Sequence, residues 1–214
     1  MTQQVAAIPF SLFLAQRAPI LLSLIVEESG FLSISSVRLN MLSIFFHPDS
    51  DDALLSRACH AYETLWKTEG EAMCQALEEV TGWSFGERMI NAIVYEGRSL
   101  SRPMALRGSY VSWRKKAMLM HELGHRLQSR MLPPPTATGR ERSRQLHQQL
   151  NLFLFPAWVQ CLGTEQAMQA VAEESSLSDS VYRECWGQYI ALTPQQRDDA
   201  LQQLKQRAVN PSSH

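Results

Sequence analysis

Segments typical of β-strands occur only in the first half of this chain, and this asymmetry limits the folds it can adopt. Alternating or β-branched residues predict strands over about 37–46, 89–95 and 104–111. After Val111 the apolar residues recur at helical spacing only. The sequence therefore predicts an α+β fold with a small sheet in the N-terminal half and a mostly helical C-terminal half.

Helices are expected between and after these strands. Asp51 or Asp49 can cap a long helix over about 52–80, in which Gly70 is a weak position. The tripeptide His47-Pro48-Asp49 is expected to form a turn before that helix. The other predicted helices cover about 8–28, 113–131, 140–162, 165–175, 179–192 and 195–207.

The length and charge of the chain set further limits. At 214 residues it is long enough for one domain with a buried core. We predict a single domain over 1–209, divided into a sheet-containing part over about 1–131 and a helical part over about 140–209, with a disordered tail at 210–214. The formal net charge is −1, so no overall positive field favours phosphates, and nucleic acid is not an expected partner.

The sequence favours a reducing, cytoplasmic location without a membrane partner. Segment 10–26 is apolar, but Arg17 and Pro19 interrupt it, and the first ten residues lack the basic residue of a secretory signal. We interpret it as a core helix, with a poor signal sequence or a pro-segment over a cleft as the alternatives. The cysteines form no C-x-x-C pair and are expected to be free thiols. They are Cys59, Cys74, Cys161 and Cys185.

The most informative motif lies in the helix predicted over 113–131, where residues 121–125 read His-Glu-Leu-Gly-His. Histidines four positions apart project from one face of a helix, so His121 and His125 can bind one ion. Zn²⁺ accepts nitrogen ligands in a tetrahedral arrangement. Glu122 is placed to take a proton from an activated water and pass it to a leaving amine. The alternative is a pair of histidines held by hydrogen bonds on an ordinary helix.

A catalytic zinc needs a third protein ligand and one open position for water. His147 is the expected third ligand, because the helix over 140–162 can return across the motif helix. Asn151, one turn later, could orient the site. Glu174 and then Glu173 are the alternatives. Metal binding is not expected of the remaining histidines, His47, His60 and His214.

The segment Met120–His125 resembles the active-site helix of the zincin metallopeptidases. The resemblance implies a zincin-like fold, with a twisted sheet and helices before the motif helix and a mostly helical part after it. It implies a zinc cofactor, a peptide or protein substrate, and Glu122 as general base. It also implies that an edge strand, here 104–111, pairs with the substrate backbone.

Two features depart from the known zincin subgroups. Met131 stands where metzincins have a third histidine, and no later glutamate is followed four residues on by the acidic residue typical of gluzincins. The chain therefore resembles a minimal gluzincin-like domain with an atypical third ligand. The alternative function is a zincin-like metal-binding module that regulates or interacts without turnover.

Two further predictions concern charge around the motif. Segment 107–144 carries nine basic and two acidic residues. This charge could attract an acidic peptide or nucleic acid. We favour the other interpretation, a solvated helix end and loop. Interleaved aromatic residues for stacking single-stranded nucleic acid are absent from the pattern.

The candidates for stabilising a developing oxyanion are Tyr110, Tyr182, Tyr189 and Arg183, which the sequence does not rank.

Overall fold

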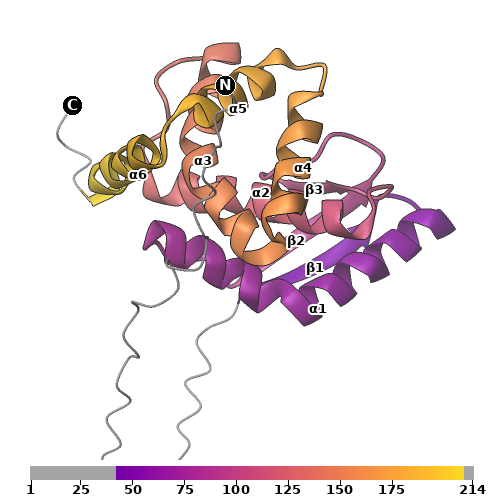
Figure 1. The fold of residues 1–214 in the computed structure, drawn as a ribbon. Helices are drawn as coiled ribbons and strands as arrows, with labels where there is room; N and C mark the ends of the chain where they lie inside the picture. The colour runs from indigo at the N-terminus through magenta and orange to yellow at the C-terminus, as the bar shows by residue number, and fades with distance from the viewer. Residues whose placement is uncertain (1–41, 210–214) are drawn as a thin grey trace, which may run out of the picture. The chain divides into compact units, whose positions relative to one another are not determined.

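The computed structural model describes residues 42–209. The predicted helix over 8–28, the start of the predicted strand over 37–46 and the tail over 210–214 lie outside the described residues. Within the described residues the chain forms a strand, a helix, two strands and then five helices (Figure 1). The predicted α+β class is confirmed.

The three strands form one parallel sheet in the order β1 (Ser43–Pro48), β2 (Met89–Tyr95) and β3 (Met104–Arg107). The register places Ile44 beside Ile90, and Ala92 beside Met104. Because alternate residues of a strand face opposite sides, one face of the sheet packs into the core and the other carries exposed side chains. The exposed apolar side chains of the strands are Phe45, Met89 and Ile93.

Two strand ends differ from the prediction. His47 and Pro48, expected to form a turn, instead continue β1 beside Ile93 and Val94. Proline is tolerated there because β1 is an edge strand of the sheet that residues 42–209 form, where a missing backbone donor disrupts no second ladder. The third strand ends at Arg107 rather than at Val111.

The long helix α1 (Ala53–Thr81) follows β1 and packs against it. Its N-cap is Asp52 rather than Asp51 or Asp49, and the Asp52 carboxylate accepts a hydrogen bond from the Leu54 amide at 2.7 Å. The helix continues through Gly70, and the Trp66 ring lies over this position, 2.7 Å from where a Cβ would stand.

Five helices complete the described chain, and α3 packs against α1, α2, α4, α5 and α6. The helices are those that the sequence predicted, with ends within about two residues. No helix among residues 42–209 is long and apolar enough to cross a lipid bilayer. The bounds are α2 (Ser112–Met131), α3 (Gly139–Leu162), α4 (Thr164–Ser175), α5 (Ser180–Ala191) and α6 (Pro194–Val209).

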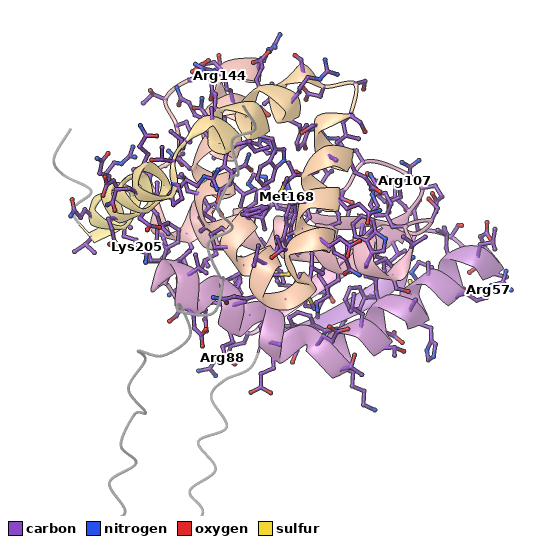
Figure 2. The ribbon with its side chains drawn as sticks, in the orientation of Figure 1. Arg57, Arg88, Arg107, Arg144, Met168 and Lys205 are labelled. Carbon is purple, nitrogen blue, oxygen red and sulfur yellow. The ribbon has the colours of Figure 1, made fainter. Side chains whose placement is uncertain are left out.

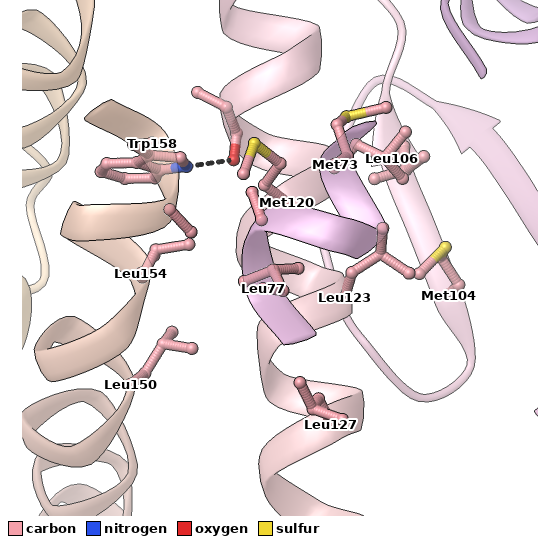
Figure 3. Close-up of a cluster of buried hydrophobic side chains, with 14 of the residues drawn as sticks. Met73, Leu77, Met104, Leu106, Met120, Leu123, Leu127, Leu150, Leu154 and Trp158 are labelled. Carbon is pink, nitrogen blue, oxygen red and sulfur yellow. Dashed lines mark hydrogen bonds between the residues drawn. The ribbon is translucent and has the colours of Figure 1, made fainter. Parts of the chain in front are cut away.

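The core between α1, α2, α3 and β3 fixes the position of α2 (Figure 3). Leu123 of α2 is fully buried, as is Leu106 of β3. On the other side of α2, the indole Nε1 of Trp158 in α3 donates a hydrogen bond to the Ala117 carbonyl at 3.1 Å (Figure 3). Apolar packing and this hydrogen bond together join α3 to α2.

Gly124 allows α3 to approach α2 closely. A Cβ at this position would lie 2.7 Å from Cδ1 of Leu150 and 3.4 Å from the Phe153 ring. Both of these α3 side chains are fully buried and have little room to move. Gly124 lies between His121 and His125 in sequence, so this close approach of the two helices occurs beside the motif.

Replacing Gly124 by alanine is expected to destabilise the protein by about 1–3 kcal/mol, because an added methyl group overpacks the α2–α3 contact. Gly187→Ala is the matched control, since Gly187 is an exposed position of α5 where an added Cβ would meet nothing within 4 Å. Alanine there should stabilise the protein by roughly 0.5–1 kcal/mol. Urea unfolding followed by circular dichroism measures both changes, and stabilisation by both variants would contradict the described contact.

Candidate metal centre

Helices α2 and α3 bring three imidazole rings together. The ring centroids of His121 and His125 are 4.9 Å apart, those of His125 and His147 are 4.9 Å apart, and those of His121 and His147 are 5.5 Å apart. One nitrogen from each ring lies within 4.8 Å of the other two. His121 and His147 are buried, and His125 is partly exposed. These three residues, which the sequence predicted as ligands, form a group that could hold a metal ion.

In two of the rings, Nδ1 is engaged by an oxygen of a neighbouring turn. Nδ1 of His147 lies 2.7 Å from the Ser143 carbonyl, which only accepts, so this nitrogen is the donor. Nδ1 of His125 lies 3.1 Å from the side-chain oxygen of Gln128. The orientation of that amide is fixed because its Nε2 donates to the Leu146 carbonyl at 2.9 Å. Both histidines therefore carry the proton on Nδ1.

Glu174 performs the same task for His121. Its Oε1 lies 2.8 Å from Nδ1 of His121, and its Oε2 accepts a hydrogen bond from the indole of Trp186 at 2.8 Å. Both side chains of this ion-pair contact are at most 5% exposed. A carboxylate behind a ligating histidine fixes the ring orientation and makes its other nitrogen a better donor to a metal.

These contacts leave the three Nε2 lone pairs available. Nε2 of His147 is buried and has no hydrogen-bond partner among the described residues. A buried polar atom without a partner costs about 1–3 kcal/mol. Three imidazoles with available nitrogens make up a set of donors that suits a transition-metal ion, so the residues present fit a bound metal.

The pKa shifts of two of the three histidines favour the neutral form. Burial, with the neighbouring histidines, holds the pKa of His125 well below its usual value, and burial lowers the pKa of His147 to about 4. Burial also lowers the pKa of His121, but the Glu174 carboxylate raises it, and the net shift is upward. His125 and His147 are therefore neutral near pH 7, which is the form that binds metals.

Glu122 lies beside this group and is 4% exposed. Burial raises the pKa of its carboxyl to about 7, although His121 acts in the opposite direction. No hydrogen bond to another side chain contributes to this shift within residues 42–209. Its carboxylate is thus buried within electrostatic reach of His121 and has no side-chain hydrogen bond among the described residues.

Tyr182 and Arg98 lie close to the histidines. The Tyr182 ring centroid is 4.6 Å from that of His147, and its hydroxyl accepts a hydrogen bond from Arg98 at 2.9 Å. Among the predicted oxyanion candidates only Tyr182 is placed here. Sequence analysis missed Arg98, because the loop between β2 and β3 that carries it shows no motif.

The other candidate residues have different partners. Tyr110 packs against Arg114, Tyr189 packs against Trp186, and Arg183 donates to the Ser175 carbonyl. Glu173, a considered third ligand, pairs with Arg114. Among the remaining histidines, His47 contacts Asn91, His60 is exposed beside Glu63, and His214 lies outside the described residues.

Asn151, which the sequence suggested could orient the site, makes no side-chain hydrogen bond to it. It is buried, yet neither its amide nitrogen nor its amide oxygen has a hydrogen-bond partner among the described residues. The backbone carbonyl of Ser143, one turn before His147, takes that position instead.

The outer edge of β3 is already occupied. The Ala105 amide and carbonyl each bond to Leu100 at 2.9 Å, and the Arg107 carbonyl accepts from the Tyr62 hydroxyl at 2.9 Å. The edge that the zincin resemblance assigns to substrate pairing therefore carries a bridge to the chain's own preceding loop.

Comparison of the chain with protein-family models, with curated proteins and with solved structures finds no match.

The order of metal affinities among variants tests this geometry. His147→Ala should remove high-affinity binding of Zn²⁺ or Co²⁺, whereas Glu174→Gln should weaken it by about 10–100-fold because His121 loses its charged partner. His60→Ala, an exposed histidine on α1, should have no effect. Competition with a chromophoric chelator measures the affinities, and unchanged binding by His147→Ala would exclude it as a ligand.

Proposed function

We propose that this protein is a zincin-like, zinc-dependent metallopeptidase. One observation carries the proposal: three imidazoles, each with Nδ1 engaged by an oxygen, gather beside the buried carboxylate of Glu122. Catalytic zinc sites typically have three protein ligands, and imidazole is a preferred one. His121, His125 and His147 would hold the zinc, and Glu174 would orient His121.

The proton transfers fall to Glu122. When bound, zinc supplies Lewis acidity, which lowers the pKa of water toward neutrality and polarises a carbonyl group. The Glu122 carboxylate takes a proton from the attacking water and then gives it to the leaving amine nitrogen. Without hydrogen bonds to other side chains of the described residues, both of its oxygens are free for this exchange.

Tyr182 and Arg98 suit the stabilisation of negative charge on the substrate oxygen. Because Arg98 donates to the Tyr182 oxygen, the proton of the hydroxyl remains free to be donated to another acceptor. The guanidinium adds a positive charge whose effect reaches Glu122 and all three histidines. Donors placed toward developing charge are a major source of rate enhancement.

The alternative is a zincin-like metal-binding module that regulates or interacts without turnover. The occupied edge of β3 favours it, because a zincin peptidase uses that edge to hold its substrate and here Leu100 bonds to it. The two functions share the metal centre and differ in the role of Glu122.

Glu122→Gln separates them. If Glu122 is the general base, this isosteric change should lower peptide hydrolysis by at least about 100-fold while zinc content stays at the parental level. Glu71→Gln, an exposed change on α1, is the control and should keep the parental rate. Cleavage of a mixed peptide library, followed by mass spectrometry, gives the rates.

Parental activity in zinc-loaded Glu122→Gln would contradict the mechanism. Absence of cleavage by the zinc-loaded parental protein would favour the module without turnover.

A further inference from the structure

A pocket of about 210 Å³ opens beside His125, between α2, α3 and the loop that joins them. Leu132, Leu146 and the run 133–135 of three prolines form apolar walls, and Arg102 and Arg142 add positive charge. No acidic side chain lines it among the described residues. Its volume is below the roughly 300–1,000 Å³ of typical small-molecule sites, so it suits a single side chain or chain end.

Most of the positive charge around the motif is paired with carboxylates, nearly all of them from outside segment 107–144. Arg107 and Arg144, both labelled in Figure 2, pair with Glu96 and Glu141. Lys115 instead donates to backbone carbonyls. The further pairs are Arg114–Glu173, Lys116–Glu69, Arg126–Glu87 and Arg140–Glu184.

Arg142 is different, because it has no ion pair or side-chain hydrogen bond within residues 42–209 and lines the pocket. Arg130 and Lys115 also lack a carboxylate partner among these residues, but the Arg130 guanidinium lies against Gly86, Lys115 donates to backbone carbonyls, and neither lines the pocket. The uncompensated charge of this segment that faces the pocket therefore belongs to Arg142.

Arg102 retains much of its charge as well. Its guanidinium is 3.7 Å from Glu87, but that carboxylate accepts hydrogen bonds from Arg126 on both oxygens, at 2.7 and 2.8 Å. One carboxylate thus serves two guanidinium groups. A substrate carboxylate that enters the pocket would meet two guanidinium groups and no competing anion among the lining residues.

We propose that this pocket is a subsite that binds a carboxylate of the substrate and that Arg142 determines this preference. The proposal rests on the proposed function, since His125 lines both the metal centre and the pocket. Guanidinium groups bind carboxylates with charge-assisted, often bidentate, hydrogen bonds. The carboxylate comes either from an aspartate or glutamate side chain or from the C-terminus of a peptide.

Peptide binding to the zinc-loaded Glu122→Gln variant tests the subsite without turnover. One set of fluorescent peptides is blocked at both ends and carries glutamate or glutamine at each position in turn. A second set is neutral in its side chains and ends in a free carboxylate or an amide. Fluorescence anisotropy gives the affinities.

The peptide with the carboxylate should bind about tenfold more tightly than its neutral counterpart. We expect this difference either at one position of the glutamate and glutamine set or in the set that varies the C-terminus. The set that shows the preference identifies its source. Adding Arg142→Gln should remove the preference, and Arg142→Lys should restore part of it. Arg57→Gln, which removes an equal charge from an exposed position of α1, should leave it unchanged (Figure 2).

Equal binding of carboxylate and neutral peptides would overturn the subsite, and a preference that survives Arg142→Gln would overturn the role assigned to Arg142. Failure of the proposed function looks different. In that case the zinc-loaded parental protein cleaves no peptide, while a carboxylate preference that depends on Arg142 still marks the pocket as a binding site.

Discussion

The close contact of α3 with α2 at Gly124 is the interaction on which the site depends. Local helix geometry places His121 and His125 on one face, but two ligands from one helix do not complete a catalytic zinc site. The third imidazole arrives because the glycine lets Leu150 and Phe153 pack against the α2 backbone, one to two turns beyond His147. The hydrogen bond from Trp158 to the Ala117 carbonyl holds the same helix pair further along.

Around this contact, every histidine of the centre is held by an oxygen from a different part of the fold. The Ser143 carbonyl precedes His147 on α3, Gln128 follows His125 on α2, and Glu174 reaches His121 from α4. Trp186 of α5 in turn holds Glu174. Four helices therefore contribute to the orientation of three rings, which indicates a rigid site with nitrogens available for a ligand.

The sequence predicted the parts of this site that follow from local spacing. Helical periodicity placed the motif, and the next amphipathic helix supplied His147. The sequence offers Glu174 only as an alternative third ligand, and its pairing with His121 and Trp186 becomes evident only when α4 packs against α2 and α5. The position of Arg98 and the bridge from Leu100 to β3 depend on how the loop after β2 folds back. His47 and Pro48, predicted as a turn, are part of a strand because β2 pairs with them. Such contacts between distant segments leave no local pattern.

The coordination of bound zinc tests the central claim most directly. X-ray absorption at the zinc edge of the purified, zinc-loaded protein should show three imidazole ligands at about 2.0–2.1 Å and one further light atom from solvent. The imidazole count should fall to two in His147→Ala. A fourth protein ligand, a sulfur ligand, or three imidazoles that persist in His147→Ala would contradict the account.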